Sequence, residues 1–140
     1  MTAILPAILP DHILSAVLVL AEKKLTEVSP GRTRLAFRSH DFELQEIFNG
    51  LRKTNKYPIL DAFVFSDSGP DPYSPALSES VSRLQLSGLI GRENPDYEVV
   101  FVRPAAERFF NEVLSRELAP PDIDQLSEVA SIFLGRVVTV

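Results

Sequence analysis

Residues 74–102 read SPALSESVSRLQLSGLIGRENPDYEVVFV, and this stretch decides the fold. Ser74 followed by Pro75 predicts a helix start, because the serine hydroxyl can accept a hydrogen bond from an unpaired backbone N–H and proline removes another. Gly88 favours the left-handed conformation that commonly ends a helix. We therefore expect a helix over residues 74–87. The apolar residues near one of its faces are Leu77, Val81, Leu84 and Leu89.

The residues after Gly88 predict a β-hairpin. Residues 89–92 fit a short strand, and residues 93–96 contain Asn-Pro-Asp, which is typical of a turn. Residues 97–102 are rich in β-branched and aromatic side chains and fit a second strand. We expect an antiparallel hairpin over residues 89–102.

An earlier helix is predicted from Asp11. Pro10 precedes it, and the Asp11 carboxylate can cap the unpaired N–H groups of the first turn. Ser29, Pro30 and Gly31 end it. The apolar residues that recur at steps of three and four are Ile13, Leu14, Val17, Leu18, Ala21 and Leu25.

A short strand and a further helix are predicted next. Residues 33–37 alternate in the manner of a strand. Ser39 or Asp41 can cap the helix that follows, and Gly50 weakens its end. The apolar side of this helix contains Phe42, Leu44, Ile47, Phe48 and Leu51.

The segment that leads into Ser74 is less regular. Residues 59–65 are apolar apart from Asp61, and periodicity in so short a run fits either a strand or a short helix. Residues 66–72 hold two prolines, one glycine and two aspartates, which predicts a loop.

Two more helices are predicted after the hairpin. Pro104 opens the first, and Pro120-Pro121 breaks it. Asp122 can cap the second, and Gly135 ends it. Residues 137–140 favour extended structure.

The expected fold class is α+β, mostly helical. Three helices followed by a hairpin are the layout of a winged helix, whose third helix enters the major groove in DNA-binding members. We expect a single domain over residues 1–140, with a winged-helix-like core closed by the hairpin. Residues 1–10 form an apolar arm, and residues 104–136 form a C-terminal helical extension with two helices.

Residues 72–90 resemble a segment of Panacea-type proteins, the relatives of the SocA antitoxin. The likeness lies in the Pro72-Tyr73-Ser74 start, the leucine-containing helix after it and the Gly88-Leu89-Ile90 exit. Asp71 departs from the Gly-Pro-Tyr-Ser-like start of that family. Outside this segment the chain resembles those proteins only in the order of its helices and strands. The resemblance implies a small regulatory or antitoxin-like module of a bacterial cell and supplies no catalytic residue.

Composition limits the function further. The chain has 140 residues, no cysteine and a net charge of −5, which excludes a disulfide framework and a thiolate nucleophile. Residues 1–57 hold eight Lys/Arg and six Asp/Glu, whereas residues 58–140 hold six and thirteen. The apolar run at residues 13–21 is too short to span a bilayer and has no basic residue before it, so we expect no membrane association and a cytoplasmic protein. The loose basic cluster is Lys23, Lys24, Arg32, Arg34 and Arg38.

No arrangement of residues predicts an enzyme. Adjacent Ser39-His40-Asp41 contains triad residue types, but a triad is assembled in space rather than along the chain. Asp61, Asp67 and Asp71 could hold a hard cation, yet the ordered spacing of a calcium loop is missing. We expect no catalytic residue, no metal and no cofactor.

Two functions remain open. The acidic second half and the apolar ends at residues 3–9 and 137–140 favour a non-catalytic regulatory or protein-interaction module, with a protein partner or a homodimer. The alternative is a transcription regulator that binds duplex DNA through helix 74–87 and hairpin 89–102. Its base- and phosphate-contacting candidates are Ser78, Ser82, Arg83, Gln85 and Arg92.

Overall fold

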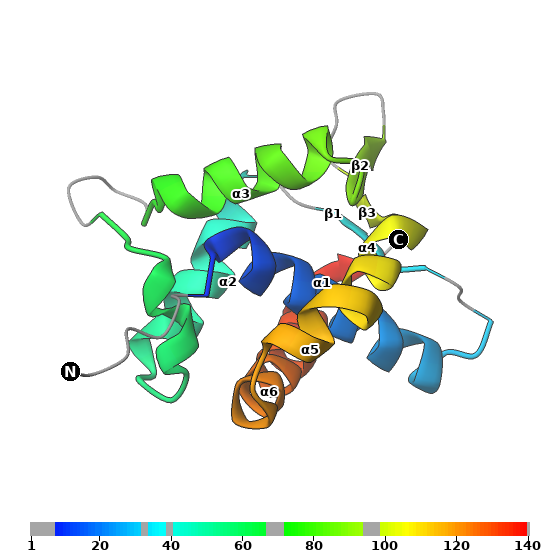
Figure 1. Cartoon of the computed structure of the whole chain (residues 1–140). Helices are drawn as coiled ribbons and strands as arrows, with labels where there is room; N and C mark the ends of the chain where they lie inside the picture. Colours follow the sequence, from blue (N-terminus) through cyan, green and yellow to red (C-terminus); the bar gives the residue numbers. More distant parts are fainter. Residues whose placement is uncertain (1–7, 32–33, 39–40, 67–71, 94–98, 140) are drawn as a thin grey trace.

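The protein was analysed as a computed structural model that describes residues 8–31, 34–38, 41–66, 72–93 and 99–139. Helices make up most of the described chain, and a small antiparallel sheet lies at one end of them (Figure 1). The predicted α+β, mostly helical class is confirmed. The arm predicted at residues 1–10 falls largely outside the described residues.

Helix α1 (Pro10–Val28) occupies the centre of the fold. It passes between α3 (Pro75–Leu86) and α6 (Pro120–Arg136), which cover opposite sides of it (Figure 1). The prediction that Asp11 caps α1 is wrong. Pro10 is the first helical residue, so the cap position belongs to Leu9, which has no side-chain acceptor. Asp11 then lies within the first turn, where its side chain is available to another element.

The elements between α1 and α3 are β1 (Ala36–Arg38), α2 (Asp41–Lys53) and the 3-10 helix η1 (Pro58–Ala62). The strand begins three residues later than predicted. Gly50 lies inside α2 rather than at its end. Of residues 59–65, residues 59–62 belong to η1, so a short helix and not a strand forms there, and residues 63–65 are irregular. The cap proposed at Ser39 lies outside the described residues.

The stretch that decides the fold has the predicted shape. The Leu77 backbone N–H donates to the Ser74 Oγ at 3.3 Å, so Ser74 caps α3 with its side chain. Gly88 ends the helix with φ of +79°, a left-handed value that favours glycine. Strands β2 (Ile90–Glu93) and β3 (Val99–Val102) then pair antiparallel. The turn between them lies outside the described residues.

The sheet has the strand order β2-β3-β1-β4, with all described pairs antiparallel. The hairpin therefore does not stand alone, because β3 pairs along its length with β1. Strand β4 (Val138–Thr139) pairs with the other edge of β1. These C-terminal residues, which the sequence favours as a partner contact, are used in the sheet of their own domain.

The C-terminal helices follow the prediction with corrected ends. α4 (Pro104–Phe109), the π-helical η2 (Phe110–Leu114) and α5 (Ser115–Glu117) follow one another directly. Helix α6 begins at Pro120, and its cap position is Ala119, so the prediction that Asp122 caps it is wrong. Gly135 does not end α6, which continues to Arg136 before the chain turns into β4.

Helix α6 belongs to the core and is not an added extension. Phe133 of α6 is fully buried and meets Phe37 of β1 edge-on, with ring centroids 5.3 Å apart. Its ring centroid lies 6.1 Å from that of Phe48 in α2, which in turn contacts Phe63. One aromatic cluster thus joins the sheet, α2 and α6. The other buried residues of α6 are Leu126, Val129 and Ala130.

Phe133→Ala tests this assignment of α6. We expect the free energy of unfolding to fall by about 3–5 kcal/mol, since the substitution leaves a cavity in the aromatic cluster. Urea unfolding measures the loss. The matched control is Ile132→Ala, at a half-buried neighbour on the same helix, for which a smaller loss is expected. Equal losses for the two variants would mean that α6 packs only loosely on the domain.

Candidate interaction surface on helix α3

Helix α3 lies on the outside of the molecule and turns one face to α1 (Figure 1). Leu77, Ser80, Val81 and Leu84 form its buried face. Four exposed residues at steps of three and four run along the opposite side, and we call them the outer ridge of α3. They are Pro75, Glu79, Ser82 and Leu86. Leu86 is 88% exposed, which is unusual for a leucine on a helix with an apolar inner face.

A polar cluster holds α3 on the first turn of α1. The Asp11 carboxylate accepts hydrogen bonds from Ser80 Oγ at 2.6 Å and from Arg83 Nε at 2.8 Å. Arg83 Nη1 also lies 3.6 Å from Glu79 Oε2, one turn back on α3. We call Asp11, Ser80 and Arg83 the Asp11 cluster. It fixes which side of α3 faces outward.

The Asp11 cluster has a defined dependence on pH. Burial acts to raise the pKa of Asp11, but the hydrogen bonds from Arg83 and Ser80 and the charge of Arg83 outweigh it, so the pKa lies below its ordinary value. A carboxyl with a lowered folded-state pKa stabilises the fold above its unfolded pKa. That stabilisation is lost as the pH falls through the folded-state value.

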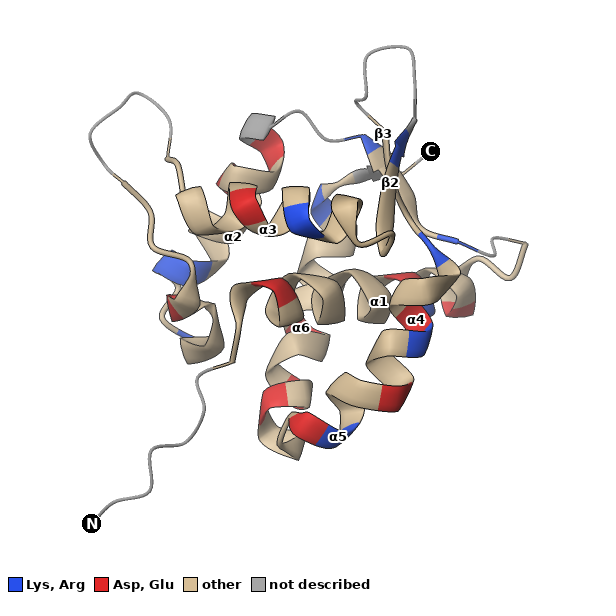
Figure 2. Ribbon diagram, turned by 45° about the horizontal axis from the view of Figure 1, so that its top comes forward, with Lys and Arg blue, Asp and Glu red and all other residues tan. Residues whose placement is uncertain are grey.

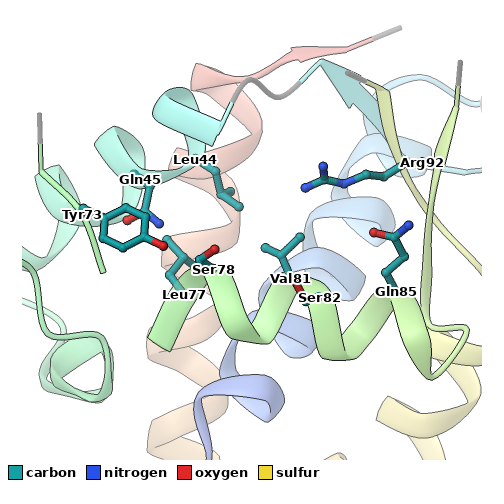
Figure 3. Close-up of a pocket in the computed structure, with 9 residues that line it drawn as sticks. All are labelled: Leu44, Gln45, Tyr73, Leu77, Ser78, Val81, Ser82, Gln85 and Arg92. Carbon is teal, nitrogen blue, oxygen red and sulfur yellow. The ribbon is translucent and has the colours of Figure 1, made fainter. Parts of the chain in front are cut away.

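A groove of about 250 Å³ lies between α2, α3 and β2. Figure 3 shows Tyr73 at one end, Arg92 and Gln85 at the other, and Leu44 and Val81 between them. We call it the α2–α3 groove. Its remaining lining residues are Gln45, Leu77, Ser78 and Ser82.

Gln45 holds the start of α3 against α2. Its Oε1 accepts from the Ser74 backbone N–H at 2.7 Å, and its Nε2 donates to the Ser74 carbonyl oxygen at 3.2 Å. Both residues are buried. This paired contact positions one wall of the α2–α3 groove relative to the other.

Of the five residues predicted for DNA contact, the structure brings four together and places one elsewhere. Ser78, Ser82, Gln85 and Arg92 line the α2–α3 groove. Arg83 lies on the other flank of α3, where it belongs to the Asp11 cluster. Arg92 is half-buried and its Nε has no solvent contact, so it is less accessible than the prediction assumed.

A second, shallower hollow of about 670 Å³ runs beside the C-terminal end of α3. It is lined mainly by apolar side chains, with Asp11 and Arg83 at its edge. His12 meets Phe109 edge-on there, with ring centroids 5.5 Å apart. The other lining residues are Leu84, Leu86, Ser87 and Leu89.

Some of the Lys and Arg positions lie in and beside the sheet, and others lie on α2, α4 and α5 (Figure 2). The guanidinium groups of Arg34 and Arg103 lie 4.5 Å and 5.1 Å from the centroid of the Phe101 ring. Gly91 pairs with Phe101 across the hairpin, and a Cβ at Gly91 would collide with that ring. A glycine is therefore needed at position 91, because it lets the Phe101 ring lie close to the backbone of β2.

Glu22 is a buried carboxylate on α1 that accepts a hydrogen bond from the Leu35 backbone N–H at 2.7 Å. Burial raises the pKa of Glu22, and the hydrogen bond from Leu35 only partly opposes it. Protonation of Glu22 therefore stabilises the folded state at low pH, and this contribution is lost as the pH rises through the folded-state pKa of Glu22. Asp11 has the opposite dependence, because its contribution is lost as the pH falls.

Two features of this surface were not predicted from the sequence. The outer ridge could have been found, because a helical period of 3.6 places Leu86 in line with Glu79 and Ser82. The Asp11 cluster had no local signal, since Asp11 and Ser80 are 69 positions apart.

Within the described ranges, no group of three or more His, Cys, Asp or Glu could hold a metal ion. Of the proposed acidic loop, Asp61 lies 3.8 Å from Arg52 Nε, and Asp67 and Asp71 are outside the described residues. Ser39 and His40 are outside them as well. No described helix is long and apolar enough to cross a membrane.

Comparison with protein families, with curated proteins and with solved structures finds no match for this chain. The resemblance of residues 72–90 to the Panacea-type segment therefore stays a prediction. Any functional inference rests on the geometry of α3 and its neighbours.

Asp11→Asn tests the Asp11 cluster. We expect lower stability at neutral pH, because the charge that orients Arg83 is removed. We also expect a smaller loss of stability on acidification, since the wild-type cluster is lost as the pH falls through the folded-state pKa of Asp11. Urea unfolding in steps from neutral pH to about pH 2, well below the ordinary pKa of aspartate, gives both curves.

The two curves should approach each other as the pH falls through the folded-state pKa of Asp11, because the wild-type carboxyl is then neutral as well. Glu22 contributes equally to both chains and cancels in the difference. Asp61→Asn, at an exposed carboxylate, is the matched control and should follow the wild-type curve. Curves that run parallel for Asp11→Asn and wild type would show that the cluster carries no pH-linked stability.

Proposed function

We propose that this chain is a non-catalytic, winged-helix-like regulatory module that binds a protein partner through the outer ridge of α3. The order α1, β1, α2, α3, β2, β3 supports the winged-helix interpretation, as does the pairing of the hairpin with β1. In DNA-binding members with that layout, the third helix is the one that enters the major groove. The resemblance of residues 72–90 fits a bacterial, antitoxin-like role in the cytoplasm, which is part of the proposal.

The ion pairs of Arg83 favour a protein over DNA as the partner of α3. Arg83 is the only Lys or Arg in α3, and its guanidinium is bound to Asp11 and faces Glu79. Neutralisation of phosphates by cations supplies much of the affinity for DNA. The outer ridge instead presents Glu79 and an exposed Leu86. An apolar side chain beside a balanced charge pair suits a protein surface.

Duplex DNA is the second candidate, favoured by one observation. Gln85 and Arg92 lie at the same end of the α2–α3 groove (Figure 3). Gln and Arg are residue types that read adenine and guanine in the major groove. The experiment must therefore separate the two kinds of partner.

Titration with duplex DNA and cross-linking separate them. By fluorescence anisotropy at low salt with pooled duplex fragments, we expect binding no stronger than sequence-independent attachment, and no effect of Gln85→Ala. A photo-reactive residue at position 86, in the cells that make the protein, should cross-link to a protein. The same residue at position 64, where Val64 is also exposed, is the control and should not.

The opposite pattern would overturn the proposal. A specific duplex whose affinity falls about 5- to 150-fold with Gln85→Ala, and is unchanged in Leu86→Ser, would assign the surface to DNA. Absence of any protein adduct at position 86 would remove the protein partner.

A further inference from the structure

We infer that the occupant of the outer ridge of α3 is the α3 helix of a second copy of this chain, packed antiparallel across a twofold axis. This inference rests on the proposed function, because it names the partner of the same surface. It is carried by the distribution of charge and apolar side chains along the ridge.

Two charges, Glu79 on the ridge and Arg83 beside it, select the antiparallel arrangement. Arg83 Nε stays on Asp11, whereas its Nη1 lies 3.6 Å from Glu79 Oε2 and is directed toward the ridge. Glu79 and Arg83 are one turn apart, with 65% and 51% of their side chains exposed. A twofold axis level with Val81 places Glu79 opposite Arg83 of the second copy, and Arg83 opposite Glu79 of that copy. The four charges then alternate in sign. Parallel packing would place like charges side by side, which is unfavourable.

The ends of the ridge complement each other in the same arrangement. Leu86 lies five positions after the axis, so it reaches the level of Ala76 in the second copy, beside the exposed Pro75. The same contact recurs at the other end by symmetry. Each copy thus buries its exposed leucine, and the contact closes as a dimer instead of extending into a chain.

The centre of the ridge permits close approach. Ser82 lies next to the axis and is small, so the two helix backbones can approach at the short end of the usual 8–10 Å range. The Asp11 cluster supports the arrangement from behind, because it holds Arg83 Nε on Asp11 and leaves α3 fixed on α1. The ridge is therefore presented in one orientation.

Sedimentation equilibrium of the full chain tests the dimer. We expect a mass of about twice 15.6 kDa. Glu79→Lys creates two Lys–Arg repulsions across the axis and should raise the dimer dissociation constant at least about tenfold. Leu86→Ser should weaken the dimer as well. Arg83 is not substituted, because it also holds α1 and α3 together.

Matched controls distinguish the ridge from general surface effects. Glu128→Lys makes the same charge change at an exposed site on α6, and Val64→Ser removes an exposed apolar side chain elsewhere. Both variants should keep the wild-type dissociation constant. Equal weakening by Glu79→Lys and Glu128→Lys would show that net charge, not the ridge, controls association, and would overturn the inference.

Single cysteines test the direction of the helices, because the chain has none of its own. In the antiparallel dimer of the Ser82→Cys variant, the two introduced thiols lie about 3 Å apart along the helix axis and should form a disulfide on mild oxidation. In the Pro75→Cys variant, also on the ridge, the two introduced thiols lie about 18 Å apart along that axis and should not. Cross-linking of both variants would indicate parallel packing and overturn the inference.

Two different results would exclude the second copy and exclude a protein partner altogether. A monomeric mass together with a protein adduct of different mass at position 86 removes the second copy and leaves a protein partner. Specific duplex binding that depends on Gln85 removes the proposed function itself.

Discussion

The burial of α1 on all sides is the constraint on which the rest of the structure depends. Residues 13–19 are buried without interruption. A helix turns once in 3.6 residues, so seven consecutive buried residues require neighbours all the way round. Helices α3 and α6 and the sheet supply them. The C-terminal helices are consequently part of the core, because without α6 a full side of α1 would be exposed to water.

This constraint also decides what α3 can do. Apolar contacts with α1 tolerate some rotation of a helix, but the Asp11 cluster is directional: Ser80 and Arg83 must both reach one carboxylate. The rotation of α3 is therefore set by polar geometry. Once it is set, Arg83 lies apart from the other predicted DNA-contacting residues, which line the α2–α3 groove, and the side facing solvent is the one with Glu79, Ser82 and Leu86.

The sequence was sufficient to predict structure wherever a few neighbouring residues determine the backbone conformation. Ser74 and Gly88 each determine their own backbone, so the start and end of α3 and the hairpin after it were predictable. Asp11 was misassigned because a carboxylate next to a helix start can cap it or bind elsewhere, and only the fold brings Ser80 within reach. Gly135 was misassigned because a glycine inside a helix costs only about 1 kcal/mol, and α6 continues through it to Arg136.

The balance of charge between α3 and the sheet follows from the same packing. Arg34 and Arg103 come from segments far apart in the sequence and converge on Phe101 because β1 pairs with β3. Glu22 and Glu107 line the hollow beside them, so these cations lie next to acidic groups. On α3, Arg83 is balanced by Asp11 and Glu79. A surface that reads DNA needs cations directed at phosphates, whereas here Arg83 Nε is held by Asp11 and Nη1 faces Glu79. The physical consequence is a helix that presents apolar area beside a paired acid and base, which are the properties that another helix can match.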